Sequence, residues 1–156
     1  MMRIGDDIAH NIALLRNGIN TFLMARLTEE GVVGLAPSHG AVLVALYEGG
    51  AQPMKAVCDR VNRDKSTLTV LARKLESLGY IRREADKNDS RVTILCLTEK
   101  GIAFRALFER ISEELRRTVW GDASEREKEA FCRQLSEMTK RIELAASGAR
   151  AGADTP

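Results

Sequence analysis

The sequence predicts a mainly α-helical fold that contains one small β-hairpin. Apolar residues recur at steps of three and four along most of the 156-residue chain, which is the period of an amphipathic helix. The period changes after Gly79, where residues 80–84 and 92–97 are β-like and the second segment is rich in Val, Thr and Ile. A charged stretch, residues 86–91, separates the two segments. We therefore expect a hairpin with a charged tip among the helices.

The first predicted helix ends at about Thr28, and its apolar positions fall on one side. These positions are Ile8, Ile12, Leu15, Ile19, Leu23 and Leu27. Gly31 and Gly34 then interrupt the helical pattern and predict a loop. A second helix is expected to start at Pro37 and to end at Gly49.

A tight turn between two helices is predicted at residues 62–64. A short helix over about residues 54–61 precedes it, and Asp64 is a good N-cap for the next helix because its carboxylate can accept from free backbone amides. That helix covers about residues 65–78 and ends at Gly79, a residue type favoured at helix C-termini. Its inward positions are Leu68, Leu71, Ala72, Leu75 and Leu78. Two helices around a tight turn, followed at once by a hairpin, predict a winged helix-turn-helix.

The C-terminal part is expected to hold two further helices. Thr98 caps a long one, which Gly121 interrupts, and Ser124 with Glu127 forms a capping box for the last one. These boundaries divide the chain into four parts. Residues 1–30 are an N-terminal dimerisation helix, 36–98 the winged helix-turn-helix with its wing at about 81–97, 99–147 the C-terminal dimerisation helices, and 148–156 a disordered tail.

The composition is typical of a soluble globular protein, with 44% hydrophobic and 29% charged residues. The longest apolar stretch, residues 41–47, is too short to cross a bilayer. Asp6 and Asp7 stand where a signal peptide would be basic and then apolar. We therefore expect a cytoplasmic protein without a targeting segment.

The cysteines, Cys58, Cys96 and Cys132, are far apart in the sequence and form no CxxC or Cys/His cluster. Neither a disulfide framework nor a zinc site is predicted. Small buried side chains in a reducing compartment are the simplest interpretation, and a cysteine-based redox-sensing regulator is the alternative.

Positive charge is concentrated in the middle of the chain. Residues 55–91 contain ten Lys and Arg against six Asp and Glu, whereas residues 1–48 contain three Arg against five acidic residues. A basic centre of this kind indicates a local anionic partner, although a solvated charged surface gives the same pattern.

With its apolar side docked, the helix over residues 65–78 presents short hydroxyls near its start and long cations further along. Its outward residues are Lys65, Ser66, Thr67, Thr69, Val70, Arg73 and Lys74. Ser and Thr are small enough for a helix to enter the DNA major groove and can hydrogen-bond to base edges, while Arg and Lys reach phosphates. The helix N-terminus adds free amides and a positive dipole end. An ordinary capped surface helix is the alternative.

The run DKSTLTVLARKLESLGYIRREADKNDSRVTILCLTEKG, residues 64–101, resembles the signature of the MarR family of bacterial transcriptional regulators. The resemblance is carried by four short pieces whose spacing agrees jointly. They are KST at residues 65–67, LE before LGYI over residues 75–81, the DSR triplet at residues 89–91, and LTEKG at residues 97–101. The close match covers about a quarter of the chain.

This resemblance implies a homodimer whose terminal helices interleave, with each recognition helix in the major groove of one half of a pseudo-palindromic operator. It also implies that Arg91 of the wing enters the minor groove and that Asp89 holds it; Lys87 is expected to contact the DNA backbone. Such proteins typically repress their own or neighbouring promoters. Many release DNA on binding small, often phenolic, ligands in a pocket between the DNA-binding lobe and the dimer helices.

A dimer is also expected from the terminal helices themselves. They carry more apolar residues than one small winged-helix lobe should cover. An isologous dimer would bury these residues and would match the two-fold symmetry of a palindromic operator. Packing of both helices on their own lobe is the alternative.

No enzyme active site, cofactor site or metal site is predicted. The sequence has no Ser/His/Asp or Cys/His set and no glycine-rich phosphate loop. His10 and His39 are the only histidines, and no metal-ligand partners accompany them. His39, at the start of the second helix, is a candidate effector contact. A winged helix that binds another protein remains the alternative function.

Overall fold

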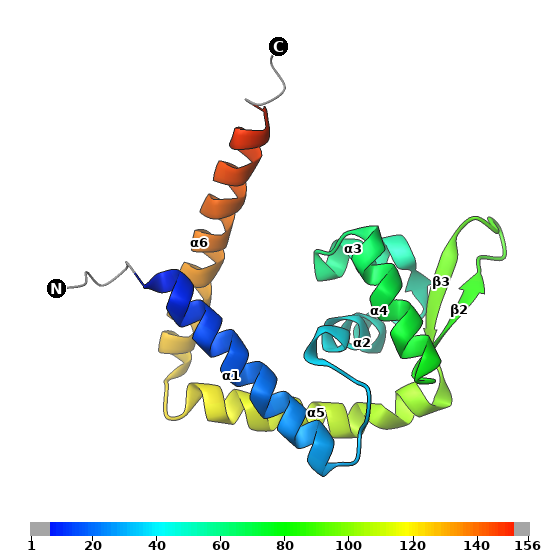
Figure 1. Ribbon diagram of the computed structural model, residues 1–156, viewed down its shortest axis with the longest axis horizontal. Helices are drawn as coiled ribbons and strands as arrows, with labels where there is room; N and C mark the ends of the chain where they lie inside the picture. Colours follow the sequence, from blue (N-terminus) through cyan, green and yellow to red (C-terminus); the bar gives the residue numbers. More distant parts are fainter. Residues whose placement is uncertain (1–6, 152–156) are drawn as a thin grey trace. The chain divides into compact units, whose positions relative to one another are not determined.

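The computed structural model describes the backbone of residues 7–151 and the side chains of residues 7–147 (Figure 1). The helices and the hairpin follow one another in the predicted order, and the strands form one small antiparallel sheet. The mainly α, winged helix-turn-helix fold is confirmed. The chain divides into two compact units, with the boundary after Leu115. Within the part of the chain that is described, no helix has both the length and the apolar character needed to cross a membrane.

The first two helices use their apolar residues differently. In α1 (Ile8–Glu29) Leu27 is the one buried residue. Ile8, Ile12 and Leu15 of its apolar stripe are each nearly half exposed. By contrast, α2 (Pro37–Gly49) contributes a block of buried side chains to the core: His39, Val42, Leu43, Ala45 and Leu46. The apolar stripe of α1 is therefore only partly covered within this unit.

The helix-turn-helix is formed by α3 (Met54–Val61) and α4 (Lys65–Ser77). Asn62 ends α3 in the left-handed conformation with φ of 49°, which a short polar side chain tolerates. Leu68, Ala72 and Leu75 of α4 are fully buried, and this spacing fixes which side of α4 faces outward.

The wing is a hairpin of β2 (Ile81–Ala85) and β3 (Thr93–Leu97), which pair antiparallel with Ile81 opposite Leu97. A third strand, β1 (Gln52–Pro53), pairs with β3 on its other edge, so the sheet order is β1-β3-β2. The strand β1 was not predicted, because a segment this short shows no alternation of apolar and polar residues and its pairing is non-local. Proline is tolerated there because β1 is an edge strand.

The start of α5 (Glu99–Trp120) is joined tightly to the end of α4. Thr98 caps α5 as predicted, since its Oγ1 accepts from Gly101 N at 3.1 Å. The same hydroxyl donates to Gly79 O at 2.5 Å, and Lys100 Nζ donates to Leu78 O at 2.7 Å. We call this set of contacts the α4–α5 junction; it satisfies carbonyls that the end of α4 would leave unpaired.

Gly101 is required at this junction. A Cβ added there would lie 2.0 Å from Tyr80 O and 3.2 Å from Leu97 Cδ2, so no other residue fits without a shift of the backbone. Beyond the junction, Phe104 and Ile111 of α5 enter the core of the first unit. The core consists of the buried apolar residues of α2, α3, α4, the sheet and these two positions of α5, together with Leu27, Leu35 and Tyr80.

The second unit contains the end of α5 and α6 (Glu125–Ala151). The predicted capping box is present: Ser124 N donates to Glu127 Oε2 at 2.8 Å, and Glu127 N donates to Ser124 Oγ at 3.4 Å. The Trp120 and Phe131 rings pack edge to face with centroids 5.7 Å apart. Side chains of α6 from residue 125 to residue 147 include no buried one.

The predicted start of a disordered tail at residue 148 is wrong, because α6 continues to Ala151. Alanine has the highest intrinsic helix propensity, and the alanine-rich sequence around Gly148 sustains the helix. The rest of the predicted tail, residues 152–156, lies outside the described residues.

Candidate nucleic-acid interface

Asp64 organises the first turn of α4. Its carboxylate accepts from Thr67 N at 2.8 Å, from Thr67 Oγ1 at 2.7 Å and from Ser66 Oγ. These donors, with the Ser66 hydroxyl first, hold the pKa of Asp64 well below its usual range, so the carboxylate stays ionised. The predicted N-cap is confirmed, and it also orders two of the residues predicted to read DNA.

The outward face of α4 presents both polar and apolar groups. Lys65, Ser66 and Arg73 are exposed, and the Val70 side chain is 67% exposed, which is unusual for an apolar residue. Thr69 is half-buried, and its Oγ1 donates to Lys65 O at 2.7 Å. This face combines small hydroxyls, one exposed methyl-bearing side chain and a cation on a helix that begins with unpaired amides.

Lys74 does not gather with the other predicted contacts. Its Nζ would lie 3.6 Å from a Cβ added at Gly34, so the side chain extends toward the loop between α1 and α2. Its charge also contributes to lowering the pKa of His39. Helical spacing gave the angular position of Lys74 correctly but could not show which neighbour lies beside it.

The tip of the wing is a structured turn. Asp86 Oδ1 accepts from Asn88 N at 2.8 Å and from Asp89 N at 3.0 Å, so Asp86 shapes the turn rather than presenting a free charge. Asp86 N donates to Val92 O at 2.9 Å and closes the loop. Lys87, in this turn, is exposed.

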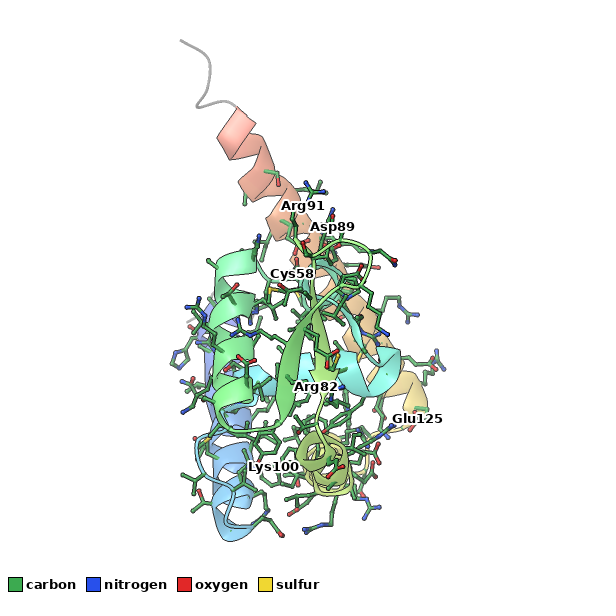
Figure 2. The ribbon with its side chains drawn as sticks, turned by 90° about the vertical axis from the view of Figure 1, so that its right-hand side faces the viewer. Cys58, Arg82, Asp89, Arg91, Lys100 and Glu125 are labelled. Carbon is green, nitrogen blue, oxygen red and sulfur yellow. The ribbon has the colours of Figure 1, made fainter. Side chains whose placement is uncertain are left out.

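Asp89 and Arg91 form the pair that the family resemblance implies. Arg91 Nε lies 3.0 Å from Asp89 Oδ1, Nη2 lies 3.1 Å from Oδ2, and Arg91 N donates to Oδ1 at 3.0 Å. The Arg91 side chain is nevertheless 89% exposed. The guanidinium holds the pKa of Asp89 below its usual value. Figure 2 shows both side chains at the wing, far from Lys100 at the other end of the domain.

A hollow of about 310 Å³ lies among α3, the start of α4 and the wing. Its basic residues are Lys55, Lys65 and Arg91, and the remainder of its lining is Met54, Cys58, Val92 and Thr93. Lys55, which lies at the start of α3, was not among the predicted contacts, and the run of positive charge from residue 55 onward was the signal for it. Arg82 and Arg83 do not line this hollow, and they pair with Glu84 and Glu76.

A second pocket, of about 210 Å³, lies among α1, α2 and α5 and is lined mainly by apolar side chains. His39 is its buried polar group. Ala36 N donates to His39 Nδ1 at 2.9 Å, and burial lowers the pKa of the imidazole, so the ring is neutral with its proton on Nε2. The residues lining this pocket are Leu23, Leu27, Leu35, Ala36, Pro37, His39, Gly40, Ala41, Leu43, Phe104, Phe108, Ile111, Ser112 and Leu115.

The three cysteines are free thiols in different surroundings. Burial raises the pKa of the Cys58 thiol and of the Cys96 thiol, which disfavours the thiolate that oxidants attack. Cys132 is exposed and belongs to the other compact unit. No group of His, Cys, Asp and Glu among the described residues could hold a metal ion.

Comparison with known proteins identifies the central region. The model of the MarR family matches residues 35–93. Over 69 residues the chain is 39% identical to the HTH-type transcriptional regulator MhqR of Bacillus subtilis, a match that covers 44% of this chain and 48% of that protein. The chain therefore spans about half the length of the curated relatives that it matches in this region.

Solved structures extend the similarity of fold beyond this region. The regulator BpsR of Bordetella bronchiseptica, whose DNA binding is regulated by 6-hydroxynicotinic acid, has a TM-score of 0.75 at 18% identity, covering 89% of this chain and 97% of that one. Reduced AbfR bound to DNA has a TM-score of 0.71 at 21% identity, covering 92% and 96%.

The curated relatives are named as HTH-type transcriptional regulators. The family model covers the turn between α3 and α4, all of α4 and the wing up to Thr93, which is the segment in which Asp64, Asp89 and Arg91 are arranged as described above. Over residues 35–93 the chain is therefore similar to the MarR family.

Proposed function

We propose that this protein is a sequence-specific DNA-binding transcriptional regulator. The observation that carries the proposal is the hollow among α3, the start of α4 and the wing, where Lys55, Lys65 at the helix start and the Asp89-held Arg91 lie around one space. An anion in this hollow would meet a helix N-terminus and several cations at once. A DNA backbone passing between the helix and the wing satisfies this arrangement.

In this function α4 enters the major groove by its first turns. Ser66, Thr67 and Thr69 allow close approach, and the exposed methyl groups of Val70 suit contact with thymine. Arg73 reaches the sugar-phosphate backbone, whereas Lys74 takes no part because it extends toward the α1–α2 loop. Arg91 enters the minor groove, where a narrow groove concentrates negative potential, and Lys87 contacts a phosphate.

The regulator acts as a homodimer on a pseudo-palindromic operator and represses transcription. The dimer is supported by the exposed apolar residues of α1 and α6, which a second copy would cover. Repression follows the typical behaviour of the family. A winged helix that binds protein would not need an exposed arginine aligned by a carboxylate beside a hydroxyl-rich helix start.

Binding of the full-length protein to randomised DNA duplexes, at stated salt concentrations, tests the function. We expect retention of a symmetric motif, with log K falling against log salt by about 0.9 per neutralised phosphate. A lysate protein retained in its place, with no duplex retained above background, would support the interaction module and overturn the proposal.

We further propose that the pocket among α1, α2 and α5 binds a small aromatic effector. The pocket is lined mainly by apolar side chains, and His39 offers one Nε2–H donor to an acceptor such as a phenolate or carboxylate oxygen. BpsR, which has the same fold, is regulated by 6-hydroxynicotinic acid. Phenol, benzoate and 6-hydroxynicotinic acid should be tried as probes of thermal stability and DNA release; no response to any of them would remove the aromatic class.

A further inference from the structure

The hydroxyl groups on the outward face of α4 already donate their protons within the protein. Ser66 Oγ and Thr67 Oγ1 both donate to the Asp64 carboxylate, the second at 2.7 Å. Thr69 Oγ1 donates to Lys65 O at 2.7 Å. A hydroxyl has one proton and two acceptor lone pairs, so what these groups offer to a partner is acceptor capacity.

The bonds to Asp64 are held more firmly than an ordinary hydroxyl contact. They are charge-assisted, and the carboxylate also accepts from Thr67 N, which fixes its position at the helix start. Turning either hydroxyl outward to donate would leave an ionised carboxylate oxygen without that donor. The Ser66 and Thr67 protons therefore stay directed toward Asp64 when a neutral acceptor approaches.

The major-groove edges of the bases differ in what they can offer to such an acceptor. Adenine N6 and cytosine N4 are amino donors, whereas guanine O6 and thymine O4 are keto acceptors. A hydroxyl that can only accept pairs with an amino group and meets a keto oxygen with lone pair against lone pair. The distinction is between adenine or cytosine and guanine or thymine on the strand that α4 faces.

We propose that Ser66 and Thr67 read exocyclic amino groups, and that Asp64 is the positioning residue that imposes this polarity. The inference rests on the proposed DNA-binding function and adds the class of base that the helix start selects. Each half-site should carry adenine or cytosine, not guanine or thymine, at the positions nearest Ser66 and Thr67. Thr69, whose proton goes to a backbone carbonyl, contributes in the same sense but is half-buried.

The first step of the test uses the full-length protein and the duplex selected from a random pool. Single adenines or cytosines in the half-site are replaced by purine or pyrimidin-2-one, the analogues that lack the exocyclic amino group. Loss of one hydrogen bond should weaken binding by about fivefold to tenfold at the contacted positions and leave other positions unchanged. Equal affinity for every analogue would overturn the proposal.

Variants then assign the effect to these side chains. Thr67→Val and Ser66→Ala remove one hydroxyl each, and each should abolish the preference for an amino base at a single position. Asp64→Asn retains an N-cap of similar strength but replaces one acceptor oxygen with a donor, which releases a hydroxyl proton. That variant should gain affinity for guanine or thymine at the same position relative to adenine or cytosine.

A purely structural role for Asp64 predicts a different result, an even loss of affinity across all sequences with a lowered melting temperature. That outcome, or an unchanged base preference in Thr67→Val and Ser66→Ala, overturns the inference while DNA binding stands. If the wild-type protein retains no duplex, the proposed function itself fails, and the two failures are distinguished by the first selection. Should Asp64→Asn fail to fold, Thr67→Val decides.

Discussion

Arg91 has 89% of its side-chain surface exposed, yet its guanidinium donates two hydrogen bonds to the Asp89 carboxylate, and its backbone N donates a third. Two of the five N–H groups of an arginine side chain are used in this way, and the rest remain available to a partner. The pair lies on a turn that Asp86 closes, so the alignment is carried by the backbone of the wing as well. Less rotamer freedom is then lost when the arginine binds.

Arg91→Ala is expected to weaken binding to the selected duplex by about 1–3 kcal/mol, because a minor-groove contact is lost. Asp89→Asn keeps the cation but loses its charged partner, and should cost less. Fluorescence anisotropy with labelled duplex measures both, and thermal melting checks that the fold is intact. Wild-type affinity in Arg91→Ala would remove the role of the wing.

His39 gives a prediction for stability against pH. Its pKa is lowered from 6.5 by burial, so the folded protein binds fewer protons than the unfolded chain when the pH falls below that value. Stability is therefore fully present above pH 6.5 and is lost as the pH falls through the folded pKa. His39→Asn keeps an acceptor for Ala36 N without a titrating ring, and urea unfolding between pH 7 and 5 should show a flatter profile for the variant.

The residue types predicted some of these contacts and not others. Asp64, Thr98 and Ser124 cap helices as foreseen, because capping depends on a local side chain and its nearest amides. The environment of Lys74 depends on the α1–α2 loop, which lies far away in sequence. Local chemistry can be predicted from sequence, but a tertiary neighbour cannot.

Among the elements, the α4–α5 junction explains why the LTEKG segment accompanies the helix-turn-helix. The Thr98 hydroxyl connects the two helices, because it donates to Gly79 O just after α4 and accepts from Gly101 N at the start of α5. Lys100 adds a bond to Leu78 O and lies 4.5 Å from the Tyr80 ring centroid. The physical reason for the LTEKG motif is the close approach of the start of α5 to the end of α4.

Gly101→Ala should destabilise the protein by about 2–3 kcal/mol, because the new methyl group would overlap Tyr80 O. Gly18→Ala is the matched control. Gly18 lies within α1 with no atom near its added Cβ, so alanine should stabilise the protein by up to about 1 kcal/mol through helix propensity. Chemical denaturation measures both, and equal effects would contradict the steric account.

The helices and strands were predicted well where the apolar pattern repeats over a long segment. The helix beginning at Pro37 and the hairpin followed from spacing and from turn residues. The strand β1 and the last residues of α6 did not, because the first depends on pairing with β3 and the second on propensity without a packed stripe. In both segments the structure does not depend on a repeating pattern of apolar residues.

At the scale of the whole molecule, apolar surface remains uncovered in both compact units. Ile8, Ile12, Leu14 and Leu15 of α1 are each about half exposed, and on α6 the exposed apolar residues are Phe131, Leu135, Ile142 and Leu144. Several exposed apolar residues on one helix are typical of an interface with another protein. The sequence predicted more apolar residues on the terminal helices than one winged-helix lobe can cover. The dimer that would cover them stays a prediction.

The dimer predicts a molar mass of twice 17.2 kDa by light scattering after size exclusion. Ile142→Asp, at a position 70% exposed in the single chain, should shift the mass toward that of one chain, since a buried carboxylate disfavours the interface. Val33→Asp, in the loop after α1 and 83% exposed, is the control and should leave the mass unchanged. A monomeric wild-type protein would contradict the dimer.

The α4–α5 junction also determines how a movement would travel through the first unit. Phe104, Phe108 and Ile111 of α5 line the apolar pocket, and the same helix begins at the bonds that hold Leu78 and Gly79. Because not even a methyl group fits between Gly101 and Tyr80 O, the start of α5 is packed directly against this backbone. We therefore expect that a displacement of the first turns of α5 tilts α4 at its C-terminal end and moves its N-terminal end, which would face DNA, by a larger distance.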